Sequence, residues 1–357
     1  GGAVIAGQFI GKQKEAEACK ATNQLLLFTV KASVVVMALG YLGRNVILHG
    51  IFGKIDADVM YNCNIYLLIV FASIPMIAVY NAGAAIFRSI GNSTIAMITS
   101  LIMNAVNLGG NAVLIYGCHR GIEGVAIPTL VSRCVAAAII LVLLNNQSRQ
   151  IHIFHPFSFH TDWNLLKKIL YIGIPNGLEN SMFQLGKLAI QSTVSTLGTA
   201  AIAAQAMTNI LENLNGMAAI GIGVGLMTIV GQCMGADRKD EAVYYIKKLC
   251  VIAEVIIIIS CLGVFALTKP ITILGGMEKV SADMCFHMVM WITIVKPIAW
   301  TMAFIPGYGL RAAGDVKFSM ITSCCTMWAC RFCLCVILIR FLEFGTMGVW
   351  IGMFADW

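Results

Sequence analysis

Long apolar runs dominate this chain, and only short segments with charge, glycine or proline separate them. A membrane-spanning helix needs about 20 apolar residues, because it rises about 1.5 Å per residue through a hydrocarbon core about 30 Å thick. Only 11% of the residues are charged, whereas a soluble domain has roughly 25%. The sequence therefore predicts an all-α polytopic membrane protein. Apolar stubs are expected at 1–9 and from 346, and spans at 24–48, 59–87, 94–117, 122–145, 165–198, 201–234, 242–267, 282–310 and 316–340.

Residue patterns argue against an enzyme. The sequence has no GxSxG, Walker or HExxH motif. Most of its 13 cysteines lie in apolar runs without zinc-ligand spacing, so they are expected to be small buried side chains, and no metal site or cofactor is predicted. Prolines inside the expected spans predict kinks at Pro75, Pro128, Pro175, Pro297 and Pro306.

An internal repeat organises the chain. GQFIGKQKEAEA from Gly7 and GQCMGADRKDEA from Gly231 lie 224 residues apart. RSIGNSTIAMITS and RAAGDVKFSMITS, from Arg88 and Arg311, lie 223 apart, and GIEGVAIP and GTMGVWIG, from Gly121 and Gly345, again 224. The matching residues are mostly glycine, polar or charged, so shared apolarity does not explain them.

The repeat predicts the topology. Six expected spans separate its first motifs, and because six is even, both copies leave the membrane on the same side. We expect two parallel six-helix lobes, at 1–145 and 164–357, joined by a cytoplasmic linker at 146–163. Lysine and arginine concentrate in the loops that carry the GQ…G and R..G motifs, which are therefore predicted to be cytoplasmic in a multi-pass plasma-membrane protein.

Together these motifs resemble the MATE (multidrug and toxic compound extrusion) family, near its NorM/DinF-like bacterial branch, over essentially the whole chain. GIPNGLENSMFQLGK, from Gly173, adds to the resemblance. It implies a twelve-helix fold of which this chain lacks the first helix and parts of the second and twelfth, and such an N- and C-terminally truncated chain is expected not to transport alone.

The resemblance also implies a function. It implies secondary, alternating-access export of drug-like amphipathic or cationic organic compounds by antiport of a monovalent cation, Na⁺ or H⁺. The expected partners are the substrate, the cation and the lipid bilayer; no nucleic-acid partner is expected, and the chain is expected to be a monomer. The family's acidic cation ligands would fall near Phe183, Trp300 and Asn111, none of which is acidic.

Polar residues at membrane depth are candidates for the substrate and cation cavity, because burying them in lipid is costly. They are Glu179, Asn180, Gln184 and Lys187 in the span at 165–198, Gln205, Asn209 and Glu212 in the next, Lys296 in the span at 282–310, and Asn104, Asn107 and Asn111 at 94–117.

Structural explanations stay open for these candidates. A Glu–Lys pair could merely lock helices together, and the asparagines could hydrogen-bond between helices. Lys296 could take the place of a bound cation or pair with Glu212 or Glu254. Lys31, Arg133 and Arg331 are expected to snorkel or pair locally.

Two other functions also remain possible. A lipid-linked oligosaccharide flippase of a related fold is the rival in transport. A membrane-bound enzyme of lipid metabolism is the rival from another class.

Overall fold

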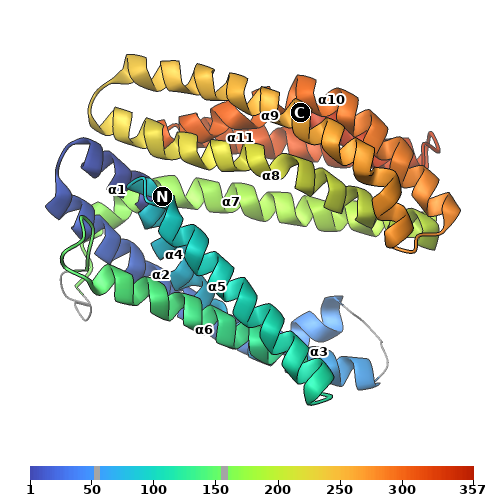
Figure 1. Ribbon diagram of the computed structural model, residues 1–357, viewed down its shortest axis with the longest axis horizontal. Coiled ribbons are helices and arrows are strands. Elements are labelled where there is room, and N and C mark those ends of the chain that lie inside the picture. Colours follow the sequence, from blue (N-terminus) through green and yellow to red (C-terminus); the bar gives the residue numbers. More distant parts are fainter. Residues whose placement is uncertain (52–56, 154–159) are drawn as a thin grey trace. The chain divides into compact units, whose positions relative to one another are not determined.

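The computed structural model describes residues 1–51, 57–153 and 160–357, which form helices and no β-strand (Figure 1). The chain divides into two compact units, Gly2–Leu170 and Tyr171–Trp357. The boundary falls inside helix α7 (Trp163–Val194), just after the linker expected at 146–163.

The described residues of the N-terminal unit form helices α1 to α6 and the start of α7. Helix α4 packs against α2 and α6, α1 packs against α2 and α4, and α5 packs against α6. The helices are α1 (Gly2–Gly11), α2 (Glu15–Ile51), α3 (Ala57–Ala72), α4 (Ile74–Ser89), α5 (Ser93–Ala112) with a π-helical end η1 (Val113–Gly117), and α6 (Glu123–Asn145).

The C-terminal unit is organised around three long helices that pack against one another, α8, α9 and α10 (Figure 1). Their interfaces hold buried residues such as Leu226, Ile257 and Ile305. The helices that follow α7 are η2 (Ser195–Leu197), α8 (Thr199–Gly235), α9 (Lys239–Leu274), α10 (Lys279–Ala313), α11 (Val316–Thr326), the π-helix η3 (Met327–Cys333), α12 (Leu334–Arg340) and α13 (Met347–Asp356).

Among the described residues, seven helices are long and apolar enough to cross a membrane, or eight if the bent pair α3–α4 is one span. They coincide with the expected spans except at 165–198, where α7 forms but is not among the seven. Large apolar side chains on the long helices are exposed, for example Leu42 (82%) and Ile298 (75%), as lipid contact requires.

A kink occurs at the predicted position before Pro75. Helices α3 and α4 meet at an angle of 42°. Between them, Ser73 accepts a hydrogen bond from Arg133 Nη1 of α6 at 2.6 Å and donates one to the Val70 carbonyl. Arg133 therefore stabilises the bend. The other four prolines expected to cause kinks lie inside single continuous helices.

The R..G motifs form equivalent helix ends. At the end of α4, Gly91 N–H donates to the Arg88 carbonyl and Asn92 N–H to the Phe87 carbonyl. At the end of α10, Gly314 and Asp315 repeat both bonds. Each glycine has a positive φ, +85° and +97°. This is a Schellman cap, which satisfies terminal carbonyls and favours glycine at that residue.

The GQ…G motifs end in the same kind of cap without glycine. Gln13 after α1 and Asp237 after α8 have φ of 59° and 57°. The next residues, Lys14 and Arg238, each donate to the carbonyl five residues back. His119 and Glu343, also 224 residues apart, have φ of 50° and 52°. The repeat read from sequence thus corresponds to repeated backbone geometry.

The segment after α6 is anchored to α2. Gln24 donates from Nε2 to the His160 carbonyl at 2.9 Å and accepts from Asp162 N–H at 3.2 Å. Asp162 then caps α7, because its Oδ1 accepts from the N–H groups of Asn164 and Leu165. The part of the predicted linker at 154–159 lies outside the described residues.

The left-handed caps can be tested by substitution. Gly91→Ala places a Cβ at a φ of +85° and should lower the free energy of unfolding by about 1 kcal/mol. Gly109→Ala, inside α5 with nothing within 4 Å of the new Cβ, should leave it unchanged or raise it. Thermal unfolding in detergent measures both variants, and equal shifts would contradict the cap.

Candidate functional site

Lys296, midway along α10, is completely buried, with 0% exposure. Its ammonium group donates to Glu212 Oε1 at 2.6 Å, to the Glu212 carbonyl at 3.0 Å and to Asn215 Oδ1 at 2.5 Å. Glu212 and Asn215 both belong to α8. A lysine ammonium has three N–H donors, so every donor of Lys296 has an oxygen acceptor from one neighbouring helix.

Two further neighbours shape this ammonium site. The Trp300 ring centroid lies 5.2 Å from Nζ, a cation–π distance. A Cβ at Gly216 would lie 3.0 Å from Nζ, so a larger residue there would press on the ammonium group. Because the acceptors include one carboxylate, the site is electrically neutral while Lys296 occupies it. A cluster of oxygen acceptors such as this one could also coordinate a small monovalent cation.

The sequence suggested two carboxylates, Glu212 and Glu254, as possible partners of Lys296. Glu212 is the ion-pair partner; Glu254 forms no ion pair with any described residue. Asn215 was not among the candidates, although it lies three residues after Glu212 and hence on the same helix face. Glu212 also does not form an ion pair with Lys187, which is exposed on α7.

Glu179 has a different partner, which the sequence did not indicate. Arg311, in the last turn of α10, donates from Nη2 to Glu179 Oε1 at 2.6 Å. The Glu179 side chain is 6% exposed, and the Arg311 guanidinium lies 5.5 Å from the Tyr308 ring centroid. Arg311 is the arginine of the second R..G motif. The motif therefore caps the end of α10 and also provides the arginine that pairs with Glu179 of α7.

The other polar candidates on α7 are exposed within the C-terminal unit. Asn180, Gln184 and Lys187 all have exposed side chains. Asn180 donates to the Asn176 carbonyl of its own helix, at 2.8 Å. These residues explain why α7, a helix of 32 residues, is not among the candidate spans. They form a polar surface that lipid would not solvate.

Gln205 and Asn209 connect α8 to the last helix. Trp350 Nε1 of α13 donates to Gln205 Oε1 at 3.1 Å, and Gln205 Nε2 donates to Asn209 Oδ1 at 3.4 Å. Gln205 is 3% exposed and Trp350 is 0% exposed. Their contact satisfies two buried polar groups between helices.

A third ion pair holds α13. Arg331 Nε in η3 lies 3.4 Å from Asp356 Oδ2, and both side chains are buried. Arg331 was expected to snorkel or pair locally, but burial rules out snorkelling, and its partner lies 25 residues further along the chain. A Cβ at Gly352 would lie 2.8 Å from the Arg331 carbonyl, so glycine permits the close approach of α13.

The asparagines of α5 make contacts between and within helices. Asn107 Nδ2 donates to Thr129 Oγ1 of α6 at 3.1 Å, and Asn111 Nδ2 donates to Asn107 Oδ1 at 3.3 Å. Asn111 Oδ1 is buried without a hydrogen-bond partner among the described residues. Asn104 is exposed. Asn107 therefore makes a hydrogen bond between helices, which was one of the explanations that the sequence left open for these asparagines.

The sequence model of the MatE family matches residues 1–113 and 175–337. The "Uncharacterized transporter YisQ" of Bacillus subtilis is 26% identical, covering 100% of this chain and 78% of its own length. The "Probable multidrug resistance protein NorM" of Thermotoga maritima is 23% identical, covering 87% of this chain and 67% of its own.

Solved structures show the same fold. A mutant of the Vibrio cholerae MATE transporter VcmN superposes with a TM-score of 0.88 over 99% of this chain and 79% of its own, at 19% identity. An outward-facing multidrug resistance MATE transporter of the MOP superfamily gives 0.86 over 99% and 80%, at 17% identity. The all-α membrane fold expected from sequence is therefore confirmed. The family match over most of the chain points to a transporter rather than an enzyme, and this multi-pass membrane protein belongs to the MatE family.

Proposed function

We propose that this chain exports amphipathic, often cationic, organic compounds by antiport of a monovalent cation, with alternating access between its two units. The relatives support this proposal, since two are named a probable multidrug resistance protein and a multidrug export protein. The observation that carries the mechanism is the buried ion pair of Glu212 and Lys296 in the C-terminal unit.

Glu212 is the exchange group in this proposal. Its side chain is 15% exposed, whereas Lys296 is 0% exposed, so an incoming cation can reach the carboxylate but not the ammonium group. A cationic substrate and a proton would compete for the exposed part of this carboxylate, while Lys296 keeps its place on the Glu212 carbonyl and Asn215. Competition for one carboxylate couples two ligands, because each can bind well only when the other has left.

The coupling ion in this proposal is a proton rather than Na⁺. Sodium would have to displace an ammonium that three acceptors hold and that the chain keeps at a high effective concentration. A proton on Glu212 instead removes the negative charge, while the Glu212 carbonyl and Asn215 still accept from Lys296. The carboxylate then no longer attracts a cationic substrate, which leaves.

The exposed polar surface of α7 is proposed to line the substrate path. Asn180, Gln184 and Lys187 cannot face hydrocarbon without losing hydration. A water-filled path is the environment in a membrane that solvates such a surface. Glu179, held by Arg311, would place a second carboxylate on this helix near the end of α10.

Substitutions at the ion pair test this mechanism. Glu212→Gln should lower pH-gradient-driven efflux of ethidium from proteoliposomes roughly fivefold or more, since coupling between ligands is typically about 1–3 kcal/mol. Lys296→Met should destabilise the fold by about 3–5 kcal/mol, because it leaves a carboxylate without a partner.

Two further variants separate mechanism from folding. The double variant Glu212→Gln, Lys296→Met removes both charges and should express and unfold like the wild type, yet fail to transport. Glu254→Gln, on neighbouring α9, is the matched control and should transport normally. Normal efflux by both Glu212→Gln and the double variant would refute the exchange role.

Orientation is tested separately. The turn between α8 and α9 belongs to the GQ…G loops proposed to be cytoplasmic, and the turn between α9 and α10 to the opposite side. An epitope inserted after Asp237 should bind antibody only in permeabilised cells, and one inserted after Gly276 should bind it in intact cells. The reverse labelling would overturn the orientation.

A further inference from the structure

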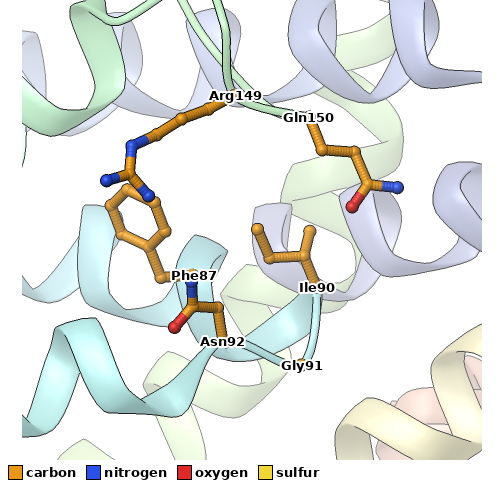
Figure 2. A pocket seen from close by; sticks show the side chains of 6 residues that line it. All are labelled: Phe87, Ile90, Gly91, Asn92, Arg149 and Gln150. Atoms are coloured by element: carbon orange, nitrogen blue, oxygen red, sulfur yellow. The ribbon is translucent and has the colours of Figure 1, made fainter.

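A hollow of about 430 Å³ lies in the N-terminal unit, where the turn between α4 and α5 faces the segment that follows α6 (Figure 2). None of the candidate substrate and cation residues named above lines this hollow. None of its lining residues is acidic; they are Phe87, Ile90, Gly91, Asn92, Arg149 and Gln150. Its volume is within the range of small-molecule sites.

Arg149 brings an uncompensated positive charge to this hollow. It forms no ion pair with any residue that the structure describes, and its buried Nε has no hydrogen-bond acceptor there. Figure 2 shows its guanidinium group beside the Phe87 ring at one side of the hollow. A buried charged donor without an acceptor is costly and often marks the place of an ion or water.

The backbone around Arg149 is fixed. Arg149 N–H donates to the Asn146 carbonyl at 3.2 Å, and Ile151, two residues later, is 0% exposed. Gln150 Nε2 donates to Glu15 Oε1 at 3.1 Å. The Glu15 carboxylate is therefore hydrogen-bonded to Gln150 and forms no ion pair with Arg149. The guanidinium therefore extends from an anchored segment.

A second polar group of the hollow, Asn92, lies directly before helix α5. Helix α5 begins at Ser93, and its N-cap Asn92 makes no side-chain capping bond. The first N–H groups of a helix lack internal partners and carry partial positive charge. Figure 2 shows the Asn92 side chain at the base of the hollow, below Phe87. Gly91 leaves the space beside it open, since a Cβ at this residue would have nothing within 4 Å.

We propose that this hollow binds a phosphate group, held by the Arg149 guanidinium and the Asn92 side chain, next to the start of α5. Arginine forms paired hydrogen bonds to phosphate, and helix starts bind phosphate through free N–H groups. The site lies at the ends of α4, α5 and α6, where a spanning helix meets the headgroup region. The phosphate could belong to an anionic phospholipid or to a soluble phosphate ester. Once bound, it would connect the α4–α5 turn to the segment after α6.

The experiment uses the full chain in detergent. Dioleoyl-phosphatidylglycerol, dioleoyl-phosphatidylcholine or inorganic phosphate is titrated, and thermal unfolding and native mass spectrometry are recorded. Wild-type protein should be stabilised by phosphatidylglycerol or by phosphate at concentrations where phosphatidylcholine has no effect. Arg149→Gln should weaken that binding roughly tenfold, because charged hydrogen bonds are lost. Arg149→Lys keeps the positive charge but cannot form two parallel hydrogen bonds to phosphate, so it should bind with intermediate affinity.

Lys14→Gln is the matched control, because it removes a charge from the same group of loops but does not line the hollow. It should bind like the wild type. Stabilisation by phosphatidylglycerol alone identifies a lipid headgroup, and stabilisation by phosphate as well identifies a soluble phosphate. Equal binding by the wild type, Arg149→Gln and Lys14→Gln would overturn the proposal, as would no binding of either ligand to the wild type.

Discussion

The buried ammonium group of Lys296, with its acceptors on Glu212 and Asn215, is the main electrostatic constraint on the C-terminal unit. A lone charge in the core of a membrane protein would be very unfavourable, and here three oxygens of Glu212 and Asn215 remove most of that cost. The contact joins α8 to α10, two of the three helices that form the unit's centre. Gly216 allows the approach. Helix packing and charge compensation therefore depend on the same residues. A change to Glu212 or Lys296 alone alters both the packing and the charge balance.

The main features of the fold could be predicted from the sequence because they rest on local chemistry. Apolar runs set the spans, and glycines 91 and 314 stand where the caps need a left-handed residue. The paired motifs that the sequence shows at one spacing have equal backbone geometry in the structure, including at non-glycine residues such as Gln13 and Asp237. These signals depend on neighbours within a turn or two. They do not depend on how the two units are arranged.

The partners of the buried charges could be predicted only in part. Two carboxylates were open to Lys296, and choosing Glu212 required the rotation of α8 against α10. Glu179 and Arg311 lie 132 residues apart, and no spacing rule links such positions. Arg331 sits in a π-helix and pairs with Asp356 across a turn, which a regular helix pattern does not reveal. The hollow at Arg149 depends on how an irregular segment folds back, and single-sequence patterns carry little information about that.

Sodium binding tests the central claim most directly, namely that Lys296 is the built-in cation of the C-terminal unit. Thermal unfolding of the wild type and of Lys296→Met is compared in sodium chloride and in choline chloride at equal ionic strength. The account predicts no sodium-specific shift in the wild type. In Lys296→Met, with the vacated oxygens of Glu212 and Asn215 open, sodium should stabilise by about 2.7 kcal/mol at a hundred times its dissociation constant. Sodium-specific stabilisation of the wild type that is lost in Lys296→Met would contradict it.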